Sequence, residues 1–203
     1  MAGRIGAVLT AGRVIIGPMS DGDADPVSRR RRFHVQERLA LIPADRWIVD
    51  EQGEHVFQVD EMAMAKLNAF ILRDPHGIEV AKLQDTHPEE EDATDIMREG
   101  RSLGTVRRSR AGLVHRYVFD AADGGSLEVH GHVGRYDYEI RRDGNVVAVV
   151  SKKWSRAHDA YAVEVSAGED EAMIVAAAIA IEAMLVAVDP DADLAAWVRS
   201  GQQ

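Results

Sequence analysis

Cysteine is absent from this 203-residue chain. Without cysteine the protein can form no disulfide, no thiol nucleophile and no cysteine-based metal site. Such a composition is compatible with a reducing compartment, so we expect a cytoplasmic protein, one that could still associate peripherally with a membrane. We also predict that it uses no cofactor and binds no metal.

Positive charge is scarce as well. Lys and Arg together number 24 against 34 Asp and Glu, so the formal net charge is -10, and only four of the 24 basic residues are lysines. Domains that bind nucleic acid normally carry a basic footprint. We therefore predict no nucleic-acid partner, although an acidic protein can still carry a local basic patch.

Long apolar runs are rare, and the most apolar one, AMIVAAAIAIEAMLVA, covers residues 172–187. This run could be a membrane span or a buried helix. A span needs about 20 apolar residues, and the charge of Glu182 would cost roughly 2–3 kcal/mol on insertion scales. We therefore predict no transmembrane span. Residues 1–20 are too often interrupted, by Arg4 and Arg13, to form a signal peptide.

A hairpin pattern is repeated between residues 47 and 150. Five segments each combine two alternating runs with a polar turn between them, and the turns contain Gly53, Gly77, Gly100, Gly124 and Gly144. Glycine supplies the positive φ that tight hairpin turns require. With a first strand at Phe33–Leu39 and a last at Tyr161–Val165, the chain would hold about twelve strands. A sheet of this length usually closes, because closure removes its exposed edges.

The apolar run is the only stretch typical of a long helix. Asp170 can cap its N-terminus and Pro190 would end it. A helix that is apolar on every face must be buried. We therefore predict a mainly β (β+α) fold, in which a closed antiparallel β-barrel of about twelve strands encloses one central hydrophobic C-terminal helix. The expected organisation is a flexible arm at 1–32, the barrel domain at 33–188 and a C-terminal tail at 189–203.

Several motifs of the chain resemble the LURP-one-related family. They are Ile-Val-Asp-x-x-Gly (48–53), VAVVSKKW (147–154), DAYAVEV (159–165) and GEDEAMIVAAAIAIEAM (168–184). The family belongs to the tubby C-terminal-like superfamily, together with the phospholipid scramblases. The resemblance covers roughly residues 33–188 and implies a twelve-stranded barrel around a central helix. Tubby domains bind phosphoinositides, but their lipid-binding residues match no position of this chain.

One basic and aromatic group is a candidate lipid site. We expect Arg141, Arg142, Lys152, Lys153 and Arg156 to form a patch for a phosphorylated head group, with Trp154 at the membrane interface. Phosphate binding requires that such cations converge on one face. In the alternative interpretation Lys152 and Lys153 point to opposite faces of a strand, one into solvent and one at a barrel rim.

Other polar groups are weaker candidates. The run Arg29–Arg32 could attract anionic surfaces, but a solvated linker is the simpler interpretation. His130 and His132 share a face of a predicted strand, yet no further metal ligand adjoins them in sequence. Two series of alternating aspartates, from Asp21 and from Asp189, lack the Gly and Glu of a calcium loop. If the helix is central, Glu182 must be paired or neutral.

These observations lead to two hypotheses. We predict a non-enzymatic barrel that binds a phospholipid or phosphoinositide head group, or a membrane surface. The alternative is a protein-interaction or scaffold domain with no lipid role, in which the acidic segment 85–95 and the two tails dock a partner. Acid/base catalysis finds no support, since no pair of carboxylates has a suggestive spacing.

Overall fold

The computed structural model describes residues 30–37, 46–60, 69–84, 93–111, 114–155 and 160–188. Most of the expected N-terminal arm, residues 85–92 of the acidic segment, Arg156 and the C-terminal tail lie outside the described residues, as do both aspartate series. The predictions that concern these segments therefore stay predictions.

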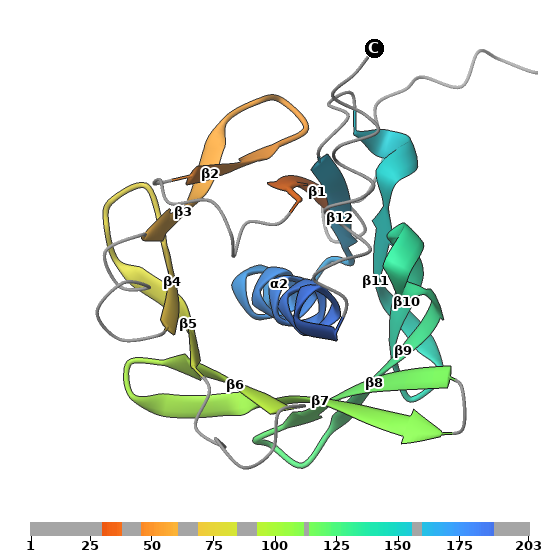
Figure 1. Ribbon diagram of the computed structural model, residues 1–203. Helices are drawn as coiled ribbons and strands as arrows, with labels where there is room; N and C mark the ends of the chain where they lie inside the picture. The colour runs from red at the N-terminus through yellow and green to blue at the C-terminus, as the bar shows by residue number, and fades with distance from the viewer. Residues whose placement is uncertain are drawn as a thin grey trace, which may run out of the picture.

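Twelve antiparallel strands form a closed barrel, in which β1 pairs with both β2 and β12 (Figure 1). The predicted fold class is confirmed. The strands are β1 Arg31–Gln36, β2 Arg46–Asp50, β3 His55–Asp60, β4 Ala69–Arg73, β5 Glu79–Gln84, β6 Ala93–Arg98, β7 Arg101–Ala111, β8 Val114–Ala121, β9 Ser126–His132, β10 Asp137–Arg142, β11 Asn145–Ser151 and β12 Ala160–Val165. Two 3₁₀ turns, η3 Val133–Arg135 and η4 Lys152–Trp154, follow β9 and β11.

The five glycine turns lie where the sequence predicts hairpins. Their φ angles run from 76° to 89°, in the region that favours glycine. The first strand differs from its predicted extent, since it begins at Arg31 rather than Phe33 and ends at Gln36. Arg31 and Arg32 pair in register with Val165 and Glu164 of β12, so they belong to the barrel wall rather than to a linker.

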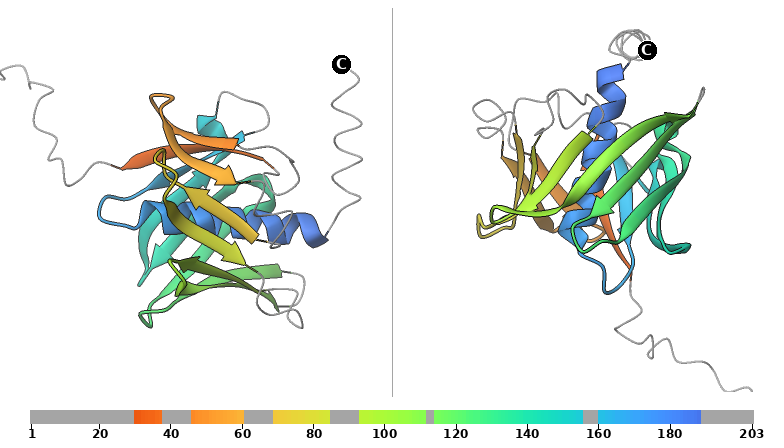
Figure 2. Two further views of the ribbon diagram at one scale, coloured as in Figure 1. Left: turned by 90° about the vertical axis from the view of Figure 1, so that its left-hand side faces the viewer. Right: turned by 90° about the horizontal axis from the view of Figure 1, so that it is seen from below.

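Helix α2, Glu171–Val188, runs through the barrel along its axis (Figure 2). Its 18 residues span about 27 Å. Eleven consecutive residues, 172–182, are each at most 8% exposed, so every face of these three turns is buried. Oδ1 of Asp170 accepts a hydrogen bond from the backbone N–H of Met173 at 3.1 Å, which confirms the predicted N-cap. The enclosed helix predicted from the apolar run is therefore present.

The barrel has two different ends. At the turn end, the glycine hairpins surround the start of α2 at Asp170. At the tyrosine end, the last turns of α2 lie beside η3 and η4, near Tyr136, Tyr161 and Glu182. No helix among the described residues is long and apolar enough to cross a membrane.

Candidate functional site

The predicted head-group cations fall into two separate pairs. Arg141 and Arg142 end β10 at the turn end, whereas Lys152 and Lys153 lie in η4 at the tyrosine end. Strand β11 separates the pairs by about 20 Å, at 3.3 Å per residue. The structure therefore does not bring these four cations to one face, and the fifth, Arg156, lies outside the described residues.

Each of these four cations lies beside a carboxylate. The closest N···O distances are 2.7 Å for Arg141–Glu139, 3.1 Å for Arg142–Glu169, 2.6 Å for Lys152–Glu37 and 3.6 Å for Lys153–Asp137. Exposed pairs such as Lys153–Asp137 contribute only about 0–1 kcal/mol and can exchange the carboxylate for another anion at little cost. Glu37 and Glu169, in contrast, are only 17% and 16% exposed.

The 3₁₀ turn η4 determines how the two lysines point. Oγ of Ser151 accepts a hydrogen bond from the backbone N–H of Lys153 at 3.2 Å, and the chain leaves the strand there. Lys152 and Lys153 are therefore not on opposite faces of a strand. The Lys153 side chain is 76% exposed, whereas Lys152 lies with its Nζ 4.5 Å from the centre of the Tyr136 ring.

Arg32, which is distant in sequence from Lys152 and Lys153, also lies beside η4. The guanidinium of Arg32 lies 4.5 Å from the centre of the Trp154 ring, although 122 positions separate the two residues. Nη2 of Arg32 also donates to Glu164 at 2.6 Å. Burial acts to raise the pKa of Glu164, but hydrogen bonds from Arg32 and Arg30 outweigh it and hold the pKa below its usual value. We define Arg32, Lys152, Lys153 and Trp154 as the η4 edge.

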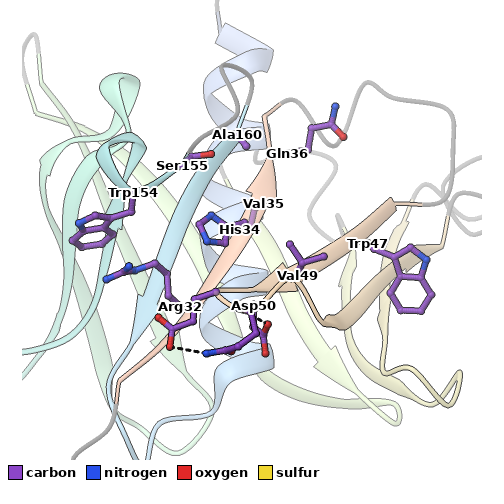
Figure 3. A pocket seen from close by; sticks show the side chains of 13 residues that line it. Arg32, His34, Val35, Gln36, Trp47, Val49, Asp50, Trp154, Ser155 and Ala160 are labelled. Carbon is purple, nitrogen blue, oxygen red and sulfur yellow. Dashed lines mark hydrogen bonds between the residues drawn. The ribbon is translucent and has the colours of Figure 1, made fainter. Parts of the chain in front are cut away.

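A groove of about 670 Å³ opens beside the η4 edge. Figure 3 shows Trp154 and Trp47 on opposite sides of it, with His34 and Gln36 of β1 between them. The Trp47 ring stacks on His55 at a centroid distance of 4.4 Å. Asp50 and Ser155 also line the groove, so it presents both aromatic faces and polar groups.

The β1–β2 junction explains where the groove lies. These two strands pair at Phe33 with Asp50 and at His34 with Val49, whereas β1 pairs with β12 along all six of its residues. Beyond His34 and Val49 the recorded β1–β2 pairing ends, and it is there that Gln36 and Trp47 face the groove. Neither the short β1–β2 pairing nor the groove has a local sequence signature.

The comparisons with known proteins agree with this architecture. Residues 31–182 match the family model described as LURP-one-related. The chain belongs to the LURP-one-related family. A crystal structure of an Arabidopsis thaliana protein has a similar fold, with a TM-score of 0.56 and 17% sequence identity over 78% of this chain and 93% of that one. At this identity the likeness shows the fold alone. A search of curated proteins finds no match.

Glu182 is the one buried carboxylate among the described residues of this LURP-one-related protein, at 3% exposure. The hydroxyls of Tyr136 and Tyr161 donate to its two oxygens at 2.6 and 3.3 Å. Burial first, and then the carboxylate itself, raises the pKa of both tyrosines well above 10. Both hydroxyls therefore stay protonated donors. The sequence indicates that a buried Glu182 needs a partner, and the two tyrosine hydroxyls fill that role.

The paired histidines are exposed on β9, and Nε2 of His130 lies 3.0 Å from Glu128. Within the described ranges, no three His, Cys, Asp or Glu side chains gather closely enough to hold a metal.

Residues 100–104, GRSLG, have the spacing Gly-x-Ser-x-Gly of a nucleophile elbow, a pattern missing from the sequence-based candidates. The elbow requires a strand–turn–helix context. Here Gly100 belongs to the β6–β7 hairpin, and Ser102 pairs with Met97 within the sheet. This segment is therefore a hairpin and not an elbow.

Proposed function

We propose that this LURP-one-related protein is a non-enzymatic binding domain whose η4 edge contacts an anionic phospholipid head group at a membrane surface. The observation that carries the proposal is that Lys152 and Lys153 lie in η4 directly before Trp154, whose ring the Arg32 guanidinium contacts at 4.5 Å. Cations beside an indole suit an interface where phosphates lie next to apolar matter. The proposal replaces the five-cation patch with a smaller group around η4.

The carboxylate beside Lys153 does not prevent this contact. Lys153 is 76% exposed and lies 3.6 Å from Asp137, which is itself 55% exposed, so a phosphate can displace that pair cheaply. The groove adds room for a head group, since small-molecule sites usually measure about 300–1,000 Å³. Its lining includes Arg32 and Ser155, which can both donate to phosphate oxygens.

Flotation with phosphatidylcholine vesicles, with and without phosphatidylserine, tests the proposal at low salt. The variant Lys152→Glu/Lys153→Glu should lose most of the binding, because each basic residue near the surface contributes about 1 kcal/mol. Arg141→Glu/Arg142→Glu is the matched control, since it makes the same charge change at the opposite end of β11. The control should float as the wild type does.

Two results would contradict the proposal. The wild type could stay with the soluble fraction on phosphatidylserine vesicles, or both double variants could lose binding equally. Equal losses would indicate a response to net charge alone, which at -10 already opposes binding to anionic membranes.

A protein partner is the second candidate function, and the groove favours it. Tryptophan is enriched at the energetic centres of protein interfaces, and Trp47 and Trp154 flank a surface that also offers hydrogen-bonding groups. Trp47→Ala would weaken such a complex, whereas Lys152→Glu/Lys153→Glu would leave it intact because neither lysine lines the groove. The acidic segment and tails, the docking elements expected from sequence, lie outside the described residues except at their edges.

A further inference from the structure

All four tyrosines of the chain contribute to one cluster at the tyrosine end. Tyr136 and Tyr161 hydrogen bond to Glu182, and their rings stack with centroids 4.7 Å apart. Tyr138 is 4% exposed and lies within the electrostatic reach of Glu182, and Tyr117 within that of Tyr138. The cluster thus joins the buried helix to the barrel wall beside η4.

Tyr136 holds an unusual backbone conformation within this cluster. Its φ and ψ are both 49°, in the left-handed region that bulky residues rarely adopt. Three contacts hold it there: the N–H donates to the carbonyl of Val133 at 2.9 Å, the hydroxyl binds Glu182 and the ring stacks on Tyr161. Conformations of this kind persist where the surroundings over-determine them, and they often mark a functional position.

Tyr136 also contacts Lys152 in two ways. Its carbonyl accepts a hydrogen bond from the backbone N–H of Lys152 at 3.2 Å. Its ring lies beneath the ammonium of Lys152, with Nζ 4.5 Å from the centroid. The carboxylate of Glu37 lies 2.6 Å from the same Nζ. Both the main chain and the charged group of Lys152 are therefore placed relative to Tyr136, and through Tyr136 relative to α2.

We propose that Tyr136, anchored by the buried Glu182, is a positioning residue that presents the Lys152 ammonium to the anionic ligand of the η4 edge. This inference rests on the proposed function. A lysine that is already ordered loses less conformational entropy when it binds, which strengthens the contact. Tyr136 itself need not touch the ligand.

The positioning can be measured without lipid. The chain has only four lysines, so reductive dimethylation with ¹³C-formaldehyde should give few NMR signals. The ring of Tyr136 should shift the Lys152 methyl signal upfield, and Lys152→Arg would assign that signal. Tyr136→Leu should return it to the position of exposed lysines, whereas Tyr136→Phe should retain the shift. An unshifted Lys152 signal in the wild type would overturn the inference, whatever the vesicles show.

Vesicle binding then tests whether the loss of this positioning weakens lipid binding. Each variant is measured below its melting temperature. Tyr136→Leu should weaken binding to phosphatidylserine vesicles about three- to tenfold, and should add nothing in a Lys152→Gln background. A purely structural role would lower stability without this dependence on Lys152. Normal binding by Tyr136→Leu, alongside weakened binding by Lys152→Gln, would overturn the positioning role alone. If Tyr136→Leu does not fold, Tyr136→Met, which also removes the ring beneath the Lys152 ammonium, provides the same comparison.

Discussion

The two ends of the barrel are stabilised by different chemistry. At the turn end, short glycine hairpins surround the start of α2, and exposed or half-exposed ion pairs join it to the wall, including Arg98–Asp170 and Arg31–Glu171. At the tyrosine end, a buried carboxylate bonds to tyrosine hydroxyls, and Arg108 donates to the carbonyl of Met184. The turn end depends on local backbone geometry, and the tyrosine end on contacts distant in sequence.

This difference predicts different responses to mutation at the two ends. Exposed ion pairs exchange readily with water, so the turn end tolerates loss of a single charge. A buried polar group that loses its partner is costly, so the tyrosine end should be more sensitive to the loss of a polar partner. We expect mutations at the two ends to differ accordingly, and the predictions that follow test that expectation.

The largest effect should come from removing the element that both ends share. Deletion of residues 170–203 removes α2 and leaves side chains such as Phe33, Ile48 and Leu127 facing an empty barrel. Each large apolar side chain exposed costs about 1.5–3 kcal/mol. The product should be insoluble or lack a cooperative thermal transition by circular dichroism. A soluble truncation that melts cooperatively would contradict the enclosed role of the helix.

Two glutamates on α2 allow a direct comparison of the ends. Glu182→Ala leaves the hydroxyls of Tyr136 and Tyr161 without this acceptor and creates a cavity, so it should lower the free energy of unfolding by about 3–5 kcal/mol. Glu171→Ala removes a pair with the half-exposed Arg31 and should cost less than about 1 kcal/mol. Urea denaturation measures both. Equal decreases in the free energy of unfolding for the two variants would contradict the distinction between the ends.

Glycines provide a second contrast, smaller in size. A Cβ at Gly131, beside the tyrosine end, would come within 2.6 Å of the Asp137 carbonyl and 2.8 Å of the Tyr138 Cα, so Gly131→Ala should cost about 2–3 kcal/mol. At Gly144, in a turn at the other end, a Cβ would meet nothing within 4 Å, and only its φ of 79° opposes alanine. Gly144→Ala should therefore cost about 1 kcal/mol. Thermal unfolding of both variants provides the comparison.

The turn end was largely predictable from sequence. The five turn glycines and Asp170 act through their own backbone and nearest neighbours, and the buried helix follows from an apolar run that only Glu182 interrupts. The tyrosine end was not predictable in this way. The contacts of Arg32 with Trp154 and of Tyr136 with Glu182 join residues far apart in sequence, and no local pattern encodes them.

A smaller effect than that of Gly131→Ala is expected at Asp170, which caps α2 and pairs with both terminal nitrogens of Arg98 at 2.8 Å. Burial acts to raise its pKa, but the hydrogen bonds from Arg98 and from the helix backbone outweigh it and lower the pKa below 3.8. Because the folded-state pKa is depressed, this stabilisation is complete above about pH 4 and disappears as the pH falls through the lowered value.

Asp170→Ala should therefore lower the free energy of unfolding by about 1–2 kcal/mol at pH 7, the usual cost of losing an N-cap. The difference from the wild type should narrow as the pH falls below 4, because protonation removes the same charge from the wild-type carboxyl. Asp137→Asn, which removes a 55% exposed carboxylate at the tyrosine end, is the control and should change stability by less than about 0.5 kcal/mol. Urea denaturation at pH 7 and at pH 3 compares the three proteins. A deficit in Asp170→Ala that is equally large at both pH values would show that the charge of Asp170 contributes nothing to the turn end.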